Sequence, residues 1–326
     1  MAADVLGAAL QNLLSVPILF FALGVVAAAL KSDLDVPPAM GKALSLYLMA
    51  AIGFKGGVEL AKSAWSVQIV LVALAAVALS LLMPLLAYRF LRSLGGLDAP
   101  NAAAVAATYG SVSVVTFVTA SAFLTRAGID HSGYLVAVLA LMETPAIITG
   151  LILARGRVRG APLLPRPVLR EALVSGSVLL LLGALLIGWA TGERGATAVG
   201  GVLIAPFQGI LALFLLDMGL LVVRRLRETN AMRWGLVAFG LYMPLVGAAL
   251  GLALAYALGL SAPDGLLLAV LAGSASYIAV PAALRVALPE ANPSIYVTLS
   301  LAITFPFNIV VGIPLYHAAA QALLGG

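Results

Sequence analysis

Ten apolar segments, each near the length that crosses a bilayer as a helix, dominate the sequence. A transmembrane helix needs about 20 apolar residues. We expect the segments at residues 11–30, 40–60, 67–90, 100–124, 133–153, 172–190, 199–223, 235–258, 265–284 and 295–316. The alternating strands of about ten residues that build membrane β-barrels are absent. The sequence therefore predicts an all-α integral membrane protein with ten transmembrane helices.

Composition supports the same class of protein. The chain is 63% hydrophobic and only 10% charged, which leaves too little polar surface to enclose a soluble core. It has no cysteine, so a disulfide framework and cysteine-based metal or redox sites are excluded. The apolar segments also lack clustered histidines or paired carboxylates, so we predict that the protein is not an enzyme and has no resident cofactor.

Lysine and arginine are divided unequally between the two sides of the predicted membrane. The side reached after odd-numbered segments holds Lys31, Lys42, Arg89, Arg92, Arg155, Arg157, Arg159, Arg166, Arg170, Arg224, Arg225, Arg227, Arg233 and Arg285. The other side holds Lys55, Lys62, Arg126 and Arg194. Because basic loops stay in the cytoplasm, we expect a multi-pass membrane protein with both termini outside the cytoplasm. The net charge of +5 follows the membrane and does not indicate a nucleic-acid partner.

The two halves of the chain resemble each other in order, at offsets of about 159 to 163 residues. The matches are LMPLLA with YMPLVG, Gly110, Ser111 and Ser113 with Gly273, Ser274 and Ser276, and Pro145 with Pro306. We assign residues 1–154 to a first five-helix repeat, 155–170 to a cytoplasmic linker and 171–326 to a second repeat. Because five is odd, the second repeat must be inverted in the membrane, an architecture common in secondary transporters.

Glycine and serine interrupt the fourth and ninth segments at equivalent places. Both residues are poor helix formers, so each helix is expected to break there and expose backbone N–H groups at the start of a new helix. Helix N-termini bind anions. We predict an anion site made of Gly110, Ser111, Ser113, Gly273, Ser274, Ser276 and Tyr277. The alternative is an ordinary packing surface of small residues between membrane helices.

Other polar residues within the segments are candidate cation ligands. Glu143 lies near the middle of the fifth segment, where an ionisable side chain is costly and usually functional. Pro145 follows it and frees a backbone carbonyl. The candidate cation ligands are Thr116, Glu143, Thr304 and Asn308, with sodium as the coupling ion. A buried structural hydrogen bond is the alternative for Glu143, and contact between helices is the alternative for Asn308.

Four motifs together resemble the cyanobacterial sodium-dependent bicarbonate transporter (SbtA-type) family. They are IGFKGGVEL, YGSVSVVT, LMETPAIIT and the long block LPEANPSIYVTLSLAITFPFNIVVGIPLY from Leu288 to Tyr316. The resemblance implies two inverted five-helix repeats, a mobile core of spans three to five and eight to ten, and a gate or scaffold domain of spans one, two, six and seven. It also implies a homotrimer, a small-anion substrate with sodium near the crossing of broken spans four and nine, and elevator-like movement.

The chain departs from the family's span-nine motif, in which Ala279 and Val280 replace a serine and a glycine and only Pro281 of two prolines remains. Tyr277 stands where the family motif has an aspartate, and Glu143 stands where the family has an aspartate before a proline. The linker is shorter than the hydrophilic loop of cyanobacterial members, which argues against a PII-like regulatory partner. The leading hypothesis is a sodium-coupled transporter of bicarbonate or a similar small anion. A transporter of a small organic carboxylate, proton-coupled or uncoupled, and a membrane sensor without transport are the alternatives.

Overall fold

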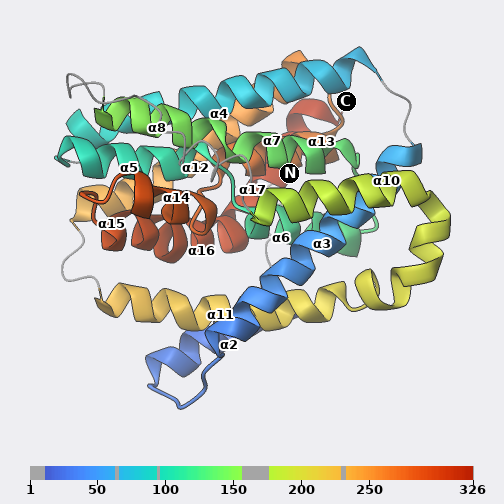
Figure 1. Cartoon of the computed structure of the whole chain (residues 1–326), viewed down its shortest axis with the longest axis horizontal. Coiled ribbons are helices and arrows are strands. Elements are labelled where there is room, and N and C mark those ends of the chain that lie inside the picture. Colours follow the sequence, from blue (N-terminus) through green and yellow to red (C-terminus); the bar gives the residue numbers. More distant parts are fainter. Residues whose placement is uncertain (1–11, 63–65, 94–95, 156–175, 229–232, 326) are drawn as a thin grey trace.

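The computed structural model describes residues 12–62, 66–93, 96–155, 176–228 and 233–325 (Figure 1). Throughout these ranges the chain forms helices and connecting turns, and no β-strand occurs among them. The predicted all-α class is confirmed. Apart from Arg155, the predicted linker of residues 155–170 lies outside the described residues.

Among the described residues, eight helical stretches are long and apolar enough to cross a membrane. They are Pro38–Lys62, Val67–Ser93, Ala99–Arg126, Tyr134–Ala154, Val178–Leu203, Phe207–Glu228, Trp234–Ala257 and Pro293–Leu324. The apolar helices within the predicted first and ninth segments are shorter: α2 (Val16–Ala29) has 14 residues and α13 (Ala262–Gly273) has 12. A predicted loop near residue 195 is helical instead, since α10 (Gly176–Leu203) continues through a kink at Gly192.

Four helices form a layer along one side of the molecule (Figure 1). In this layer α3 (Pro38–Lys62) packs on α10, and α2 packs on α11 (Phe207–Glu228). Glycines allow both pairs to approach closely. A Cβ at Gly24 would collide with the Leu216 carbonyl oxygen, and one at Gly188 would collide with the Phe54 carbonyl oxygen. The two helix pairs are therefore held by the same kind of contact.

The contact at Gly188 predicts a large difference between two glycines of α10. A methyl group at Gly188 meets only backbone atoms of Phe54 and Val58, whereas one at Gly183 meets nothing within 4 Å. Gly188→Ala is expected to destabilise the fold by about 1–3 kcal/mol, since a packed interface must shift. Gly183→Ala is expected to be neutral or stabilising by up to about 1 kcal/mol. Thermal unfolding in detergent tests both, and equal melting temperatures would contradict the assigned packing.

The remaining helices form the main bundle, in which two similar corners occur. In one, α4 (Val67–Ser93) packs on α5 (Ala99–Gly110), and a Cβ at Gly110 would strike the Pro84 ring. In the other, α12 (Trp234–Ala257) packs on α13, and a Cβ at Gly273 would lie 2.7 Å from the Pro244 carbonyl oxygen. Each corner thus joins a proline inside one helix to the last glycine of the next.

The helices that enter these corners also begin alike. The Asp98 carboxylate caps α5 by accepting a hydrogen bond from the Asn101 N–H at 3.1 Å. The Ser261 hydroxyl caps α13 and accepts from the Asp264 N–H at 3.4 Å. In both helices an alanine and a proline follow the cap, and proline is preorganised for the first helical turn. Both helices therefore start and stop by the same local signals.

Candidate functional site

The fourth predicted segment contains two helices with an extended stretch between them. Helix α5 ends at Gly110, and Ser111 follows in an extended conformation with φ −88° and ψ 174°. Helix α6 (Val114–Arg126) begins after Ser113, whose hydroxyl accepts a hydrogen bond from the Thr116 N–H at 3.2 Å. Serine favours such caps because its short side chain competes for backbone hydrogen bonds. The polar residues therefore lie at the junction of two helices.

The ninth segment has the matching arrangement. Helix α13 ends at Gly273, Ser274 is extended with φ −93° and ψ 170°, and α14 (Ala279–Ala287) starts after Ile278. The Ser276 hydroxyl accepts from the Val280 N–H at 3.3 Å in the first turn of α14. The first N–H groups of any helix lack acceptors within that helix. Both stretches therefore present the amino ends of helices to the interior.

The two extended stretches are hydrogen-bonded to each other. The Ser113 N–H donates to the Ser274 hydroxyl oxygen at 2.9 Å, and that hydroxyl donates to the Leu271 carbonyl at 3.0 Å. The Ser276 N–H donates to the Thr108 carbonyl at 2.8 Å. These bonds satisfy backbone groups that a helix end leaves unpaired. Residues from both halves of the chain therefore fix the geometry of the candidate site.

Glu143 is brought to the same place by a third helix end. Helix α7 (Tyr134–Glu143) stops at this residue, and Pro145 begins α8 (Pro145–Arg155). Proline cannot donate a backbone hydrogen bond and so favours a helix boundary at this position. The Ser111 hydroxyl donates to the Glu143 carbonyl at 3.0 Å. The carboxylate is buried, with 4% of the residue exposed, and it has no hydrogen bond or ion pair to any described residue.

A small cavity lies where these elements meet, and we call it the crossing cavity. Its lining includes Met49, Ser113, Glu143, Ser276, Tyr277 and Ile278. Its volume is about 10 Å³, close to the smallest space that holds one water molecule. Three of the five predicted polar side chains at the two breaks, those of Ser113, Ser276 and Tyr277, thus line one small cavity together with Glu143.

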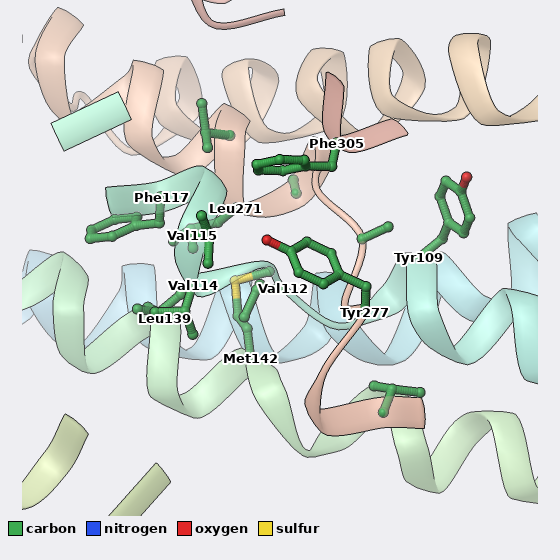
Figure 2. Close-up of a cluster of buried hydrophobic side chains, with 14 of the residues drawn as sticks. Tyr109, Val112, Val114, Val115, Phe117, Leu139, Met142, Leu271, Tyr277 and Phe305 are labelled. Carbon is green, nitrogen blue, oxygen red and sulfur yellow. The ribbon is translucent and has the colours of Figure 1, made fainter. Parts of the chain in front are cut away.

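Tyr277 fills much of the space beside this cavity. Figure 2 shows its ring projecting from the stretch between α13 and α14, among Val112, Val114, Met142 and Phe305. The Tyr277 and Phe305 rings are edge to face at 5.4 Å between centroids. The buried hydroxyl forms no hydrogen bond of proper geometry with a described residue, although Ser113 is near enough to interact with it. A buried polar atom without a partner is costly, so this hydroxyl is available to a ligand.

Three of the four predicted cation ligands lie outside the lining of the crossing cavity. The Thr116 hydroxyl is buried without a partner among the described residues. The Thr304 hydroxyl donates to the Gly240 carbonyl at 2.7 Å and meets the Tyr109 hydroxyl at 2.5 Å. Pro244 explains the first bond, because a proline leaves the carbonyl four residues earlier unpaired.

Asn308 is also engaged elsewhere. Its side-chain NH₂ donates to the Gly273 carbonyl at 2.9 Å, and its oxygen accepts from the Tyr316 hydroxyl at 2.9 Å. Asn308 begins the second of two π-helical stretches, Thr298–Thr304 and Asn308–Gly312, which flank the short helix α16 (Phe305–Phe307) that contains Pro306. Both Thr304 and Asn308 therefore satisfy backbone carbonyls at helix ends or beside prolines, and their role as cation ligands stays a prediction.

A much larger pocket lies on the other side of Tyr277, and we call it the vestibule. It has a volume of about 540 Å³ and lies between the helix layer and the main bundle. Its lining includes Lys42, Met49, Phe214, Asp217, Tyr277 and Arg285. Met49, Tyr277 and Ile278 line both the vestibule and the crossing cavity, so these three side chains separate the two spaces. Sequence reasoning missed the vestibule, since it treated its basic residues only as signals of membrane orientation.

At the opposite end of α3 the helix layer is packed tightly against the main bundle. A Cβ at Gly133 would collide with the Gly56 carbonyl oxygen. Beside this contact the Lys55 ammonium donates to the Thr125 hydroxyl at 3.4 Å. The His131 Nε2 lies 2.7 Å from the Ser121 hydroxyl, and burial lowers the pKa of this imidazole below its usual range. The two groups of helices thus enclose about 540 Å³ at one end of α3, whereas the pocket beside Gly56 and Gly133 at the other end has only about 40 Å³.

The described chain contains several apolar helices long enough to span a membrane, and the breaks inside two of its spans are polar and buried. These features define a multi-pass membrane protein. The profile of the Na⁺-dependent bicarbonate transporter superfamily matches residues 17–321. The chain belongs to this superfamily, as the four motifs predicted. A transporter family agrees with the prediction that the protein is not an enzyme. No curated protein matches the chain significantly.

Proposed function

We propose that the protein is a secondary transporter of bicarbonate, or a similar small anion, coupled to sodium. The observation that carries the proposal is the crossing cavity, where hydroxyls and helix amino ends from two broken segments face the unpartnered Glu143 carboxylate. Such a symporter needs hydrogen-bond donors to bind the anion and a negative charge to bind the cation. Membership of the superfamily supports the same substrate pair.

The available donors roughly balance the cost of removing a small anion from water. That cost is several kcal/mol even after the protein relaxes. Two helix amino ends could return up to about 2 kcal/mol each, and each hydrogen bond to a charge about 1.5–3 kcal/mol. We assign these donors to the amino ends of α6 and α14, with the hydroxyls of Ser113, Ser276 and Tyr277. The hydroxyls of Ser111 and Ser274 donate to backbone carbonyls in this structure, so they join the donor set only by giving up those bonds. In this proposal a sodium ion bound beside Glu143 and Thr116 offsets the remaining negative charge of the anion.

Ten spans in two inverted repeats are part of the proposal. The repeated corners at Pro84 with Gly110 and at Pro244 with Gly273 support it. The helix layer supports it as well, because the contact of Gly24 with Leu216 matches that of Gly188 with Phe54 once the repeats are exchanged. In this scheme the short helix α2 is the first span, and α13 with α14 forms the broken ninth span. The helix layer is the gate domain, which forms a homotrimer, and the main bundle is the core.

Alternating access in this proposal is an elevator-like movement of the core against the gate. The vestibule supports an inward-open arrangement, since Lys42, Arg224, Arg225 and Arg285 line it and belong to the side that positive charge assigns to the cytoplasm. The tight contact of Gly56 with Gly133 narrows the other side to a pocket of about 40 Å³. The protein is then a bacterial inner-membrane transporter with both termini outside the cytoplasm. Because the crossing cavity has room for only about one water molecule, Tyr277 must move before bicarbonate can enter it from the vestibule.

Transport is tested with the purified full-length protein in proteoliposomes. We expect uptake of labelled bicarbonate that an inward sodium gradient accelerates and that a choline gradient of equal strength does not. A membrane potential supplies about 2.3 kcal/mol per charge per 100 mV, so sodium and potential are varied separately. Absence of uptake under every gradient would refute bicarbonate as the substrate.

A second candidate keeps the fold and replaces bicarbonate by a small organic carboxylate. The observation that favours it is Tyr277, which puts an aromatic ring and a neutral hydroxyl beside the crossing cavity. A drier site of this kind suits an anion that carries a methyl or methylene group. Thermal-shift screening of bicarbonate against short carboxylates separates the two candidates, since a ligand of the folded state raises the melting temperature.

A further inference from the structure

We propose that the vestibule is a separate binding site for an amphipathic monocarboxylate, a carboxylate attached to an apolar body much larger than bicarbonate. Sites for small organic molecules usually enclose about 300–1,000 Å³. The vestibule encloses about 540 Å³, whereas the crossing cavity encloses about 10 Å³. Such a ligand fits in the vestibule and cannot pass into the crossing cavity in this conformation.

The walls of the vestibule are suited to an apolar body. Phe214 and Met218 of α11 face it from the helix layer, and Ile278 and Leu301 face it from the main bundle. Binding sites for small organic molecules are mostly apolar, with a few polar groups that fix the orientation. A ligand in contact with both walls buries apolar surface that would otherwise face water, which stabilises the complex.

The charges indicate where the carboxylate lies. Arg224 is paired with Asp35 at 2.8 Å, and Arg225 is paired with Glu228 at 2.9 Å.

Lys42 of α3 and Arg285 of α14, in contrast, form no ion pair with a described residue. They belong to the two different walls, so a carboxylate between them would bridge the helix layer and the main bundle. Arg285 can bind a carboxylate through two parallel hydrogen bonds.

Asp217 limits the ligand to one negative charge. This residue lines the vestibule, is 7% exposed and has no ion pair with a described side chain. Two unpaired cations and one unpaired carboxylate leave a single positive charge to be matched. A dianion would be opposed by Asp217, whereas a monocarboxylate complements the set. Removing the Asp217 charge should therefore strengthen binding, and removing Arg285 should weaken it.

Binding is tested by isothermal titration calorimetry of 4-phenylbutyrate into the full chain in lipid nanodiscs, with empty nanodiscs subtracted. The matched neutral probe is 4-phenylbutyramide, which has the same apolar body. We expect the carboxylate to bind at least tenfold more tightly than the amide. Arg285→Gln should weaken binding of the carboxylate at least fivefold, and Asp217→Asn should strengthen it. Arg126→Gln removes an arginine outside the vestibule lining and should change nothing.

Equal binding of the two probes, or equal effects of Arg285→Gln and Arg126→Gln, would overturn the proposal. If Arg285→Gln does not fold, Lys42→Gln replaces it with the same expected loss. A ligand bridging both walls also opposes their relative movement, so 4-phenylbutyrate should inhibit bicarbonate uptake. This last expectation rests on the proposed function, whereas the calorimetry does not, so failure of one is distinguishable from failure of the other.

Discussion

Replacing Glu143 by glutamine is expected to abolish the dependence of uptake on sodium while leaving the protein folded. The carboxylate faces the crossing cavity and has no partner among the described residues, so no structural bond of this side chain is lost. A hydrogen bond to a charged group contributes about 1.5–3 kcal/mol, and 1.4 kcal/mol is a tenfold change in affinity. The sodium concentration for half-maximal uptake should therefore rise at least tenfold, or the dependence should disappear. Initial uptake rates at varied sodium measure this.

Glu143→Asp is the matched control, because it keeps the carboxylate and only shortens the side chain. It should retain sodium-dependent uptake at a reduced rate. Removing an unpaired buried charge should also keep or raise the melting temperature of Glu143→Gln, since burying such a charge is costly. A glutamine variant with unchanged sodium dependence would remove Glu143 from the cation site and leave the fold assignment intact.

Replacing Ser274 by alanine is expected to reduce bicarbonate uptake severely and to destabilise the protein. Its hydroxyl accepts from the Ser113 N–H and donates to the Leu271 carbonyl, so it joins the two extended stretches. Leaving a buried N–H without an acceptor costs about 1–3 kcal/mol. The two helix amino ends also lose the bond that fixes their relative position. Uptake rates and thermal unfolding, measured on the same preparation, report both effects.

Ser80→Ala separates the two effects of the Ser274 variant. The Ser80 hydroxyl is also fully buried and donates to a backbone carbonyl, that of Met142, at 2.8 Å. Its loss should also lower the melting temperature, but by less, because Ser80→Ala removes one donated hydrogen bond and leaves no buried N–H without an acceptor. Uptake per folded protein should be kept, since Ser80 forms no hydrogen bond to either extended stretch. Equal loss of uptake in both variants would mean that Ser274 acts only through stability.

Most helices were predictable because their causes are local. The apolar segments, the serines after Gly110 and Gly273, and the proline after Glu143 act within a few residues of themselves. These signals predicted which residues would gather at the site, although the sequence did not show how small the enclosed space would be. The kinked helix α10 was not predicted. Gly192, with φ 54°, turns the chain there while the residues on both sides stay helical.

What could not be predicted depends on distant parts of the chain. Thr304 bonds the carbonyl that Pro244 leaves unpaired, and only the packing of α12 on the last span reveals this. Lys42 and Arg285 are far apart in sequence, so a pocket between them has no local signal. Met49 of α3 also separates the two cavities, and nothing in the sequence around it marks this position.

The hydrogen bonds that join the two extended stretches constrain how the halves of this chain can diverge. The Ser113 N–H depends on Ser274, and the Ser276 N–H depends on the Thr108 carbonyl, so each half completes the backbone bonding of the other. A substitution in one half therefore changes the environment of a residue that the other half supplies. Tyr277 is an example, because its hydroxyl lies near Ser113 of the opposite half. Substrate preference in such a protein should evolve through paired changes, one in each duplicated half.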